Sequence, residues 1–266
     1  MAEIKPIRII FKEVSAPATT ALSEETTLAD RFAAVANVLI TSHAQVNAAE
    51  SIRVVADFLE AIILLDDHYG ADSVLPVENA ANLADEAIRA IADISRLGLE
   101  YAIPKMDATV DNIVIGIGLW CMRHKLAIFS PEPIVNALAR RANEATNIQE
   151  IVATYALMKA FVLHLAPSLK SDLERSNPER PWRLLNVNLA ITAIRTGDAT
   201  MMRAAFDSLN DALPDERSGF YAEAYTLASQ PGFPTEIRAL IEREHRQFTL
   251  MHQGNSSDAL IQLNMR

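Results

Sequence analysis

The stretch Asn188–Pro214, "NLAITAIRTGDATMMRAAFDSLNDALP", contains two apolar runs separated by Thr196, Gly197 and Asp198. Glycine readily adopts the left-handed backbone conformation that closes many helices, and aspartate is favoured as the cap of the next helix. Proline then ends the second run, because it cannot continue a helix. The stretch therefore predicts two helices joined by a tight turn, and it contains no recognisable catalytic set.

The composition of the whole chain favours helices throughout. Half of the 266 residues are apolar, but only 6% are aromatic and only 8 are glycine. A sheet-rich fold needs glycine at its turns and β-branched runs in its strands, whereas alanine-rich segments favour closely packed helices. Together with the prolines and the helical spacing of apolar residues, this predicts an all-α fold, with helices beginning near residues 23, 47, 76, 110, 131, 147, 181, 198, 215 and 234.

For two of these helices the sequence predicts further details. The third places Leu83, Ala87, Ile91 and Ile94 at helical spacing, which predicts that they share its apolar face. The helix that begins near residue 147 is expected to end near residue 165, because Pro167 follows.

The later helix starts repeat at the spacing of a helical hairpin. Those near 181 and 215 lie 34 residues apart, and those near 198 and 234 lie 36 apart. The segment of about 182–215 resembles the tetratricopeptide repeat, because six positions fit the pattern of that repeat: Leu189, Ala190, Gly197, Asp198, Phe206 and Pro214. Three positions depart from the pattern: Asn186 and Ala193, where aromatic residues are missing, and Met202.

The resemblance covers one repeat unit, and it implies a surface of stacked helices that binds a partner peptide or protein. It implies no catalytic residue. Helices of about twenty residues in the first half are too long for this repeat. We therefore expect a divergent, right-handed α–α superhelix of about ten helices in antiparallel pairs over residues 23–252. Residues 1–22 are expected to form an extended arm and linker, and residues 253–266 a flexible tail.

The first fourteen residues differ in pattern from the rest of the chain. The run "IKPIRIIFKEV", residues 4–14, is β-branched and partly alternating, as is typical of a strand, and "SAPATT" is typical of a linker. A lone strand is not stable in water, because its backbone groups need partners. One interpretation is an arm that joins a structural homo-oligomer or pairs with another chain. The other is an extended tail that lies over the helices of its own chain.

Charge and cysteine content exclude several classes of protein. The net charge is −10, and residues 1–110 account for −9 of it, which disfavours nucleic-acid binding there. The single cysteine, Cys121, excludes an internal disulfide framework and a zinc site built on several thiolates. No apolar run is long enough to predict a membrane span, and the N-terminus lacks the apolar core of a secretory signal. We expect a cytoplasmic protein.

The main candidate for a partner-binding surface lies where the opening stretch begins. Arginines at positions 175, 180, 183, 195 and 203 surround a tryptophan. Both residue types are favoured at interface hot spots, and arginine also in carboxylate clamps. We predict that a protein or peptide partner binds in a helical groove near Trp182, Arg183, Asn186, Asn188 and Arg195. The alternative is that the arginines lie in a solvated linker and at helix ends, and that the asparagines bond to neighbouring helix ends.

A second function, a helical-bundle enzyme that binds a metal or a small ligand, is the alternative. Asp66, Asp67 and His68 lie near a helix end, where acids oppose the helix dipole. A divalent metal would offset that effect, and so would nearby arginines or exposure to solvent.

The E-x-x-H spacing of Glu242 and His245 is the other metal pattern. Di-iron bundles use this pair, but they need a second copy of it, which the sequence lacks. The other interpretation is an exposed charged face on which Glu242 pairs with Arg246.

The run "GIGLWC" comes close to two further motifs. Gly116 and Gly118 nearly match a dinucleotide-binding fingerprint, but no strand precedes them, so we expect glycines that let a neighbouring helix approach closely. Cys121 and His124 share a helix face, yet an inert buried cysteine fits the apolar surroundings better than a nucleophile does. We therefore predict a non-catalytic adaptor, scaffold or chaperone-like module, with no cofactor.

Overall fold

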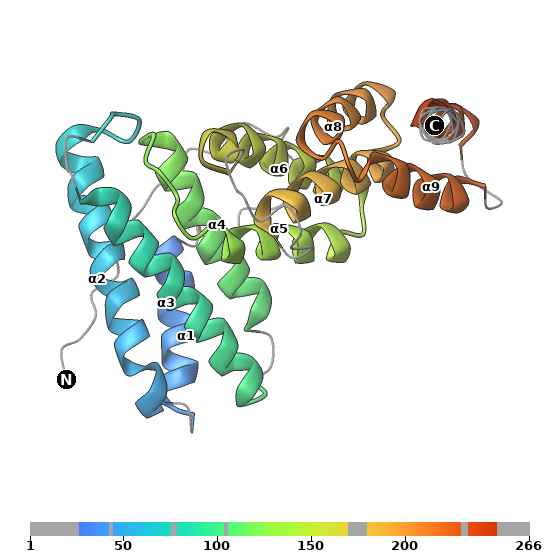
Figure 1. Cartoon of the computed structure of the whole chain (residues 1–266). Coiled ribbons are helices and arrows are strands. Elements are labelled where there is room, and N and C mark those ends of the chain that lie inside the picture. The colour runs from blue at the N-terminus through green and yellow to red at the C-terminus, as the bar shows by residue number, and fades with distance from the viewer. Residues whose placement is uncertain are drawn as a thin grey trace, which may run out of the picture. The chain divides into compact units, whose positions relative to one another are not determined.

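The computed structural model describes residues 27–42, 45–75, 79–103, 106–169, 180–229 and 234–248. Within these ranges the chain forms ten helices and no strand, which confirms the all-α fold class (Figure 1). The tenth helix covers residues 235–248. The other nine are α1 (Leu28–Ile40), α2 (Gln45–Tyr69), α3 (Ala80–Glu100), α4 (Asp107–Arg123), α5 (Glu132–Glu144), α6 (Ile148–Leu169), α7 (Pro181–Thr196), α8 (Ala199–Ala212) and α9 (Arg217–Ala228).

The chain divides into two compact units, residues 1–141 and 142–266. The division falls inside α5, and the predicted helical domain of residues 23–252 stays a prediction. The predicted boundaries of the arm at 22 and of the tail at 252 lie outside the described residues, so they stay predictions. The handedness of a superhelix also stays a prediction.

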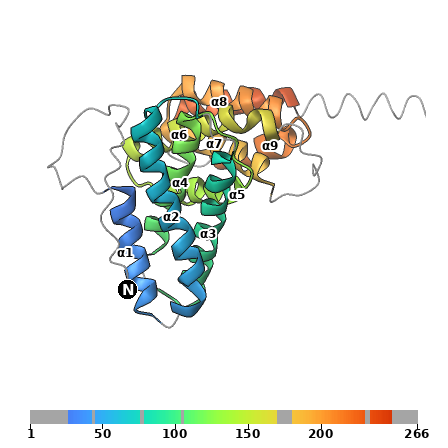
Figure 2. The same cartoon turned by 90° about the vertical axis from the view of Figure 1, so that its left-hand side faces the viewer.

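In the first unit, α1 to α4 form a closed ring of helices. Each packs against the next along the chain, and α1 also packs against α4. Helices α2 and α3 lie side by side in both views (Figures 1 and 2), and they share the most extensive of these packings. The apolar faces of the four helices meet inside the ring, and α4 is buried nearly all round, as its sequence predicted.

The first helix begins later than the sequence predicted. Leu28 is its first residue, and Thr27 caps it: the Thr27 side chain accepts the backbone N–H of Asp30, and the Asp30 carboxylate accepts the backbone N–H of Thr27 at 3.0 Å. This reciprocal capping box satisfies two backbone donors that the helix itself cannot, so it sets the start of the helix there rather than near residue 23.

In the second unit, the opening stretch forms the predicted hairpin. Helix α7 ends at Thr196, and Gly197 follows with a φ of 69°. The Asp198 carboxylate then accepts the backbone N–H groups of Thr200 and Met201, both at 2.8 Å, at the start of α8. Helix α7 packs against both α6 and α8, so neighbouring helices are paired as expected for a helical-repeat fold.

Two detailed expectations are wrong. Helix α6 continues past Pro167 to Leu169, because a proline near a helix end removes one N–H bond without ending the helix. Leu83 is 42% exposed, although Ala87, Ile91 and Ile94 are buried. It lies in the first turn of α3, at the edge of the buried face, and it lines the groove described below.

One stretch among the described residues, Ile148–Ala166 in α6, has the length and apolar composition of a membrane-crossing helix. Core helices of globular proteins can share these properties. Tyr155, Met158, Phe161 and Leu165 of this helix are buried against the second unit's own core.

Candidate functional site

The predicted partner-binding residues make internal contacts. Trp182 is 4% exposed and Asn186 is fully buried. The Asn186 amide donates to the Trp182 carbonyl oxygen at 2.8 Å, and its oxygen accepts from Ser208 Oγ at 3.0 Å, so it links α7 to α8. Both side chains are therefore engaged in packing α7 within its own unit.

The remaining three predicted residues are partly or fully accessible but also engaged. Arg183 forms an ion pair with Glu216, and the Asn188 amide donates to the Leu184 carbonyl oxygen at 2.8 Å. The Arg195 guanidinium donates to two carbonyl oxygens at the end of α5, those of residues 142 and 145. The structure therefore spreads the five residues over several internal contacts, and their role toward a partner stays a prediction.

Asp66 belongs to a polar network that joins α2 to α4. Its Oδ1 accepts from Trp120 Nε1 at 2.9 Å and contacts His124 Nε2 at 2.8 Å, and its Oδ2 accepts from Arg123 at 3.2 Å. The other ring nitrogen of the fully buried His124 lies 2.7 Å from the Ser73 carbonyl oxygen. Arg123 is thus the nearby arginine that offsets the acid at the end of α2.

Metal ligands do not converge at either predicted site. Asp67 and His68 are exposed, and no group of three or more potential ligands lies together in the ranges described above. Glu242 pairs with Arg246, as one interpretation of the sequence had it. The His245 ring instead stacks on Tyr225, with centroids 4.8 Å apart.

The "GIGLWC" run packs as expected of a buried helix. A Cβ atom on Gly116 would lie 2.9 Å from Leu28 Cδ1, so this glycine lets α1 approach α4 closely. Cys121 is fully buried, and burial raises the pKa of its thiol to about 12. Because the thiolate is the nucleophilic form, we expect this cysteine to be unreactive in the folded protein.

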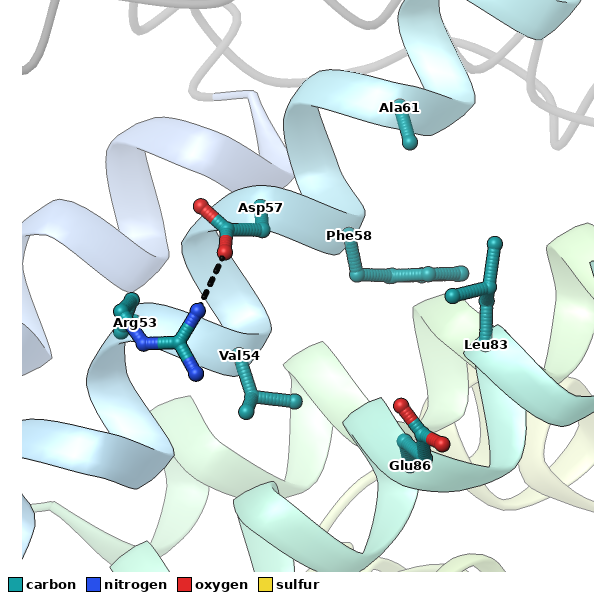
Figure 3. A pocket seen from close by; sticks show the side chains of 7 residues that line it. All are labelled: Arg53, Val54, Asp57, Phe58, Ala61, Leu83 and Glu86. Carbon is teal, nitrogen blue, oxygen red and sulfur yellow. Dashed lines mark hydrogen bonds and ion pairs between the residues drawn. The ribbon is translucent and has the colours of Figure 1, made fainter.

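A groove lies between α2 and α3, and the sequence did not predict it. Apolar and charged side chains line this groove on the surface of the first unit. It consists of two adjoining hollows that share Val54 and Glu86. Figure 3 shows the first, where the Phe58 and Leu83 side chains approach each other across the gap between the helices. We call this surface the α2–α3 groove; its lining residues are Glu50, Ser51, Arg53, Val54, Asp57, Phe58, Ala61, Leu83, Glu86, Arg89, Ala90 and Asp93.

Acidic side chains dominate the rim of the α2–α3 groove. Arg53 bonds to Asp57 at 3.0 Å and to Glu50 at 2.6 Å. The hydrogen bond from Arg53 lowers the pKa of the Glu50 carboxyl, so this exposed acid stays ionised below the usual range. Glu86 makes no hydrogen bond or ion pair with any residue that the structure describes.

The second arginine of the groove, Arg89, is bound by two residues that do not line the groove. Arg89 pairs with Asp85 at 2.5 Å and donates to Ser130 Oγ at 3.0 Å. The Asp85 side chain is only 5% exposed, and the arginine compensates the charge of this buried acid. Arg89 therefore contributes little positive charge to the rim, and the groove remains acidic.

The size of the two hollows limits what they hold. They are open, shallow hollows of about 180 and about 250 Å³, whereas sites for small-molecule ligands typically have volumes of about 300–1,000 Å³. Their floor is apolar, with Val54, Phe58 and Ala90. Each hollow thus suits one or two apolar side chains of a larger molecule better than a free metabolite.

No protein-family model, no curated protein sequence and no solved structure matches this chain.

Proposed function

We propose that the protein is a non-catalytic interaction module, of the adaptor, scaffold or chaperone-like kind, that binds a segment of a partner protein in the α2–α3 groove. The observation that supports this most is the combination of two side-chain-sized apolar hollows with an acidic rim. Glu86, which lines both hollows and pairs with no residue of the described ranges, offers one negative charge to a basic group of the partner.

The spacing of the hollows defines the partner segment. Their lining residues are centred about five residues apart on each helix, which corresponds to ~7.5 Å along the groove. Side chains two residues apart in an extended strand are separated by about 6.6 Å, and those four apart in a helix by about 6 Å. The expected segment therefore presents two apolar side chains at one of these spacings, flanked by lysine or arginine.

Selection of peptides from a random library displayed on phage tests this proposal. The immobilised full chain should enrich peptides with the apolar spacing and basic flanks just described. The variant Arg8→Glu with Lys12→Glu serves as a parallel target. A basic segment of the chain itself, which contains both residues, would compete with peptides for the acidic rim, and the two substitutions reverse its charge.

Two charge reversals of equal size separate the groove from general electrostatics. Glu86→Lys should weaken binding of the enriched peptides by at least about tenfold, because it places a like charge in the groove. Glu60→Lys is the matched control, since Glu60 is an exposed residue of α2 that does not line the groove. Equal weakening by both variants, or no enrichment on either target, would show that the groove is not the binding site.

A further inference from the structure

The α2–α3 groove matches the chemistry of a segment of its own chain. We infer that residues 4–12, "IKPIRIIFK", occupy the groove and so exclude an external partner until they are displaced. This inference rests on the proposed function, because it takes the groove to be a peptide-binding site. The segment lies outside the described residues.

Charge is the first match between the segment and the groove. Residues 4–12 carry Lys5, Arg8 and Lys12 and no acidic side chain. Helices α2 and α3 carry nine acidic side chains and three arginines. All three arginines, Arg53, Arg89 and Arg96, are already paired with acids of the same helices. The segment therefore brings positive charge to the most acidic helix pair of the first unit.

Spacing is the second match. The apolar side chains of Ile7, Ile9 and Phe11 alternate with other residues, and the sequence predicts an extended conformation. Alternate side chains of a strand lie on one side, about 6.6 Å apart, close to the ~7.5 Å between the hollows. Two successive members of this series fill the two hollows. Lys5 lies on the same side of the strand as these apolar residues, whereas Arg8 and Lys12 lie on the other side, and their long aliphatic stems bend back toward the acidic rim.

The length of the connection favours the same molecule over a second copy. Residues 13–26 link the segment to Thr27, the cap of α1, and a chain of this length spans up to about 50 Å. Helix α2 is about 37 Å long, so the segment can reach any point along the groove of its own unit. A tether this short also keeps the effective concentration near the millimolar range, above that of other copies in dilute solution.

Disulfide trapping in the full chain tests the inference. The variant Ile9→Cys with Leu83→Cys places one thiol in the segment and one at the exposed edge of the groove. Mild oxidation should convert most of this variant to an intramolecularly crosslinked monomer. The control pairs Ile9→Cys with Leu64→Cys, because Leu64 is 65% exposed on the same unit but does not line the groove. The native Cys121 does not interfere, because it is buried.

The outcomes distinguish this inference from the proposed function. Preferred crosslinking at Leu83, lost when Arg8→Glu and Lys12→Glu are added, supports occupancy by the segment. Crosslinked dimers, or equal crosslinking at Leu64, overturn it. If the enriched peptides bind the groove but this crosslink is absent, the proposed function stands and the inference falls.

A second measurement keeps the test independent of the introduced cysteines. The enriched peptides should bind the Arg8→Glu, Lys12→Glu variant about tenfold more tightly than the unaltered chain, because the competing segment no longer holds the groove. Equal affinity for the two proteins overturns the inference, and it leaves the peptide-binding function in place.

Discussion

Replacing Asp66 with asparagine tests whether the acids at the end of α2 serve the fold or a metal. The carboxylate faces two donors, Trp120 Nε1 at 2.9 Å and Arg123 at 3.2 Å, and it also contacts His124 Nε2 at 2.8 Å. An amide keeps one acceptor oxygen and places an NH₂ group where the second oxygen was. Whichever way it turns, at least one donor loses its partner, and Arg123 loses a charged one.

The size of the effect follows from these contacts. A hydrogen bond to a charged group contributes about 1.5–3 kcal/mol, and breaking a buried ion pair costs about 3–5 kcal/mol. The Asp66 and Arg123 side chains are 17% and 23% exposed, so water replaces part of what is lost. We expect Asp66→Asn to lower the free energy of unfolding by about 2–3 kcal/mol. Urea denaturation followed by circular dichroism at 222 nm measures this value.

The neighbouring acid provides the control. Asp67 is exposed and forms no ion pair with any residue in the described ranges. Asp67→Asn should change the free energy of unfolding by less than about 0.5 kcal/mol, and toward greater stability, because it removes a negative charge near a helix C-terminus. If both variants lost stability equally, or if a chelator destabilised the unaltered protein as much as Asp66→Asn does, the metal interpretation would replace ours.

Three further predictions concern single residues. Cys121 should not react with a thiol reagent at pH 8 until the protein is unfolded in urea, because burial raises the pKa of its thiol to about 12; rapid labelling of the folded protein contradicts this. A methyl group added at Gly197 or Gly219 meets no atom within 4 Å, but only Gly197 has a positive φ. Gly197→Ala should therefore lower the free energy of unfolding by about 1 kcal/mol, whereas Gly219→Ala should raise it by about 0.5 kcal/mol. Urea denaturation measures both values. Asp198→Ala should lower the free energy of unfolding by about 1 kcal/mol. Asp198→Asn should lower it much less, because asparagine also caps helices. Equal losses in the two variants would contradict the capping role.

The features that the sequence predicted well depend on local chemistry. A left-handed residue and a capping carboxylate act within one turn of backbone, so the turn at Gly197 and Asp198 could be located from the residues alone. The paired packing of helices followed in the same way from the spacing of apolar residues. The sequence did not locate the start of α1 at Leu28, because several nearby residues are suitable caps. In the structure Thr27 is the cap.

The features that were missed depend on which helices meet. Leu83 has the spacing of a core residue, but its turn of α3 lies at the edge of what α2 covers, so it lines a groove instead. The groove itself joins residues about thirty positions apart, such as Val54 and Glu86, and no local pattern marks such a pair. Only the acidic excess of residues 1–110 indicated in advance that a charged surface lay in this half.

The arginine cluster around Trp182 shows why charge in a sequence is ambiguous about partners. The chemistry that lets arginine bind a partner's carboxylate also lets it bind one of its own chain, and Arg183 does so with Glu216. Glu86 is the opposite case, because its carboxylate lies beside an apolar floor and pairs with none of the residues that the structure describes. A charged residue therefore argues for an external ligand only once the fold has been shown to leave it without an internal one. By that criterion we propose the α2–α3 groove of the first unit, rather than the arginine cluster of the second, as the surface that binds a partner.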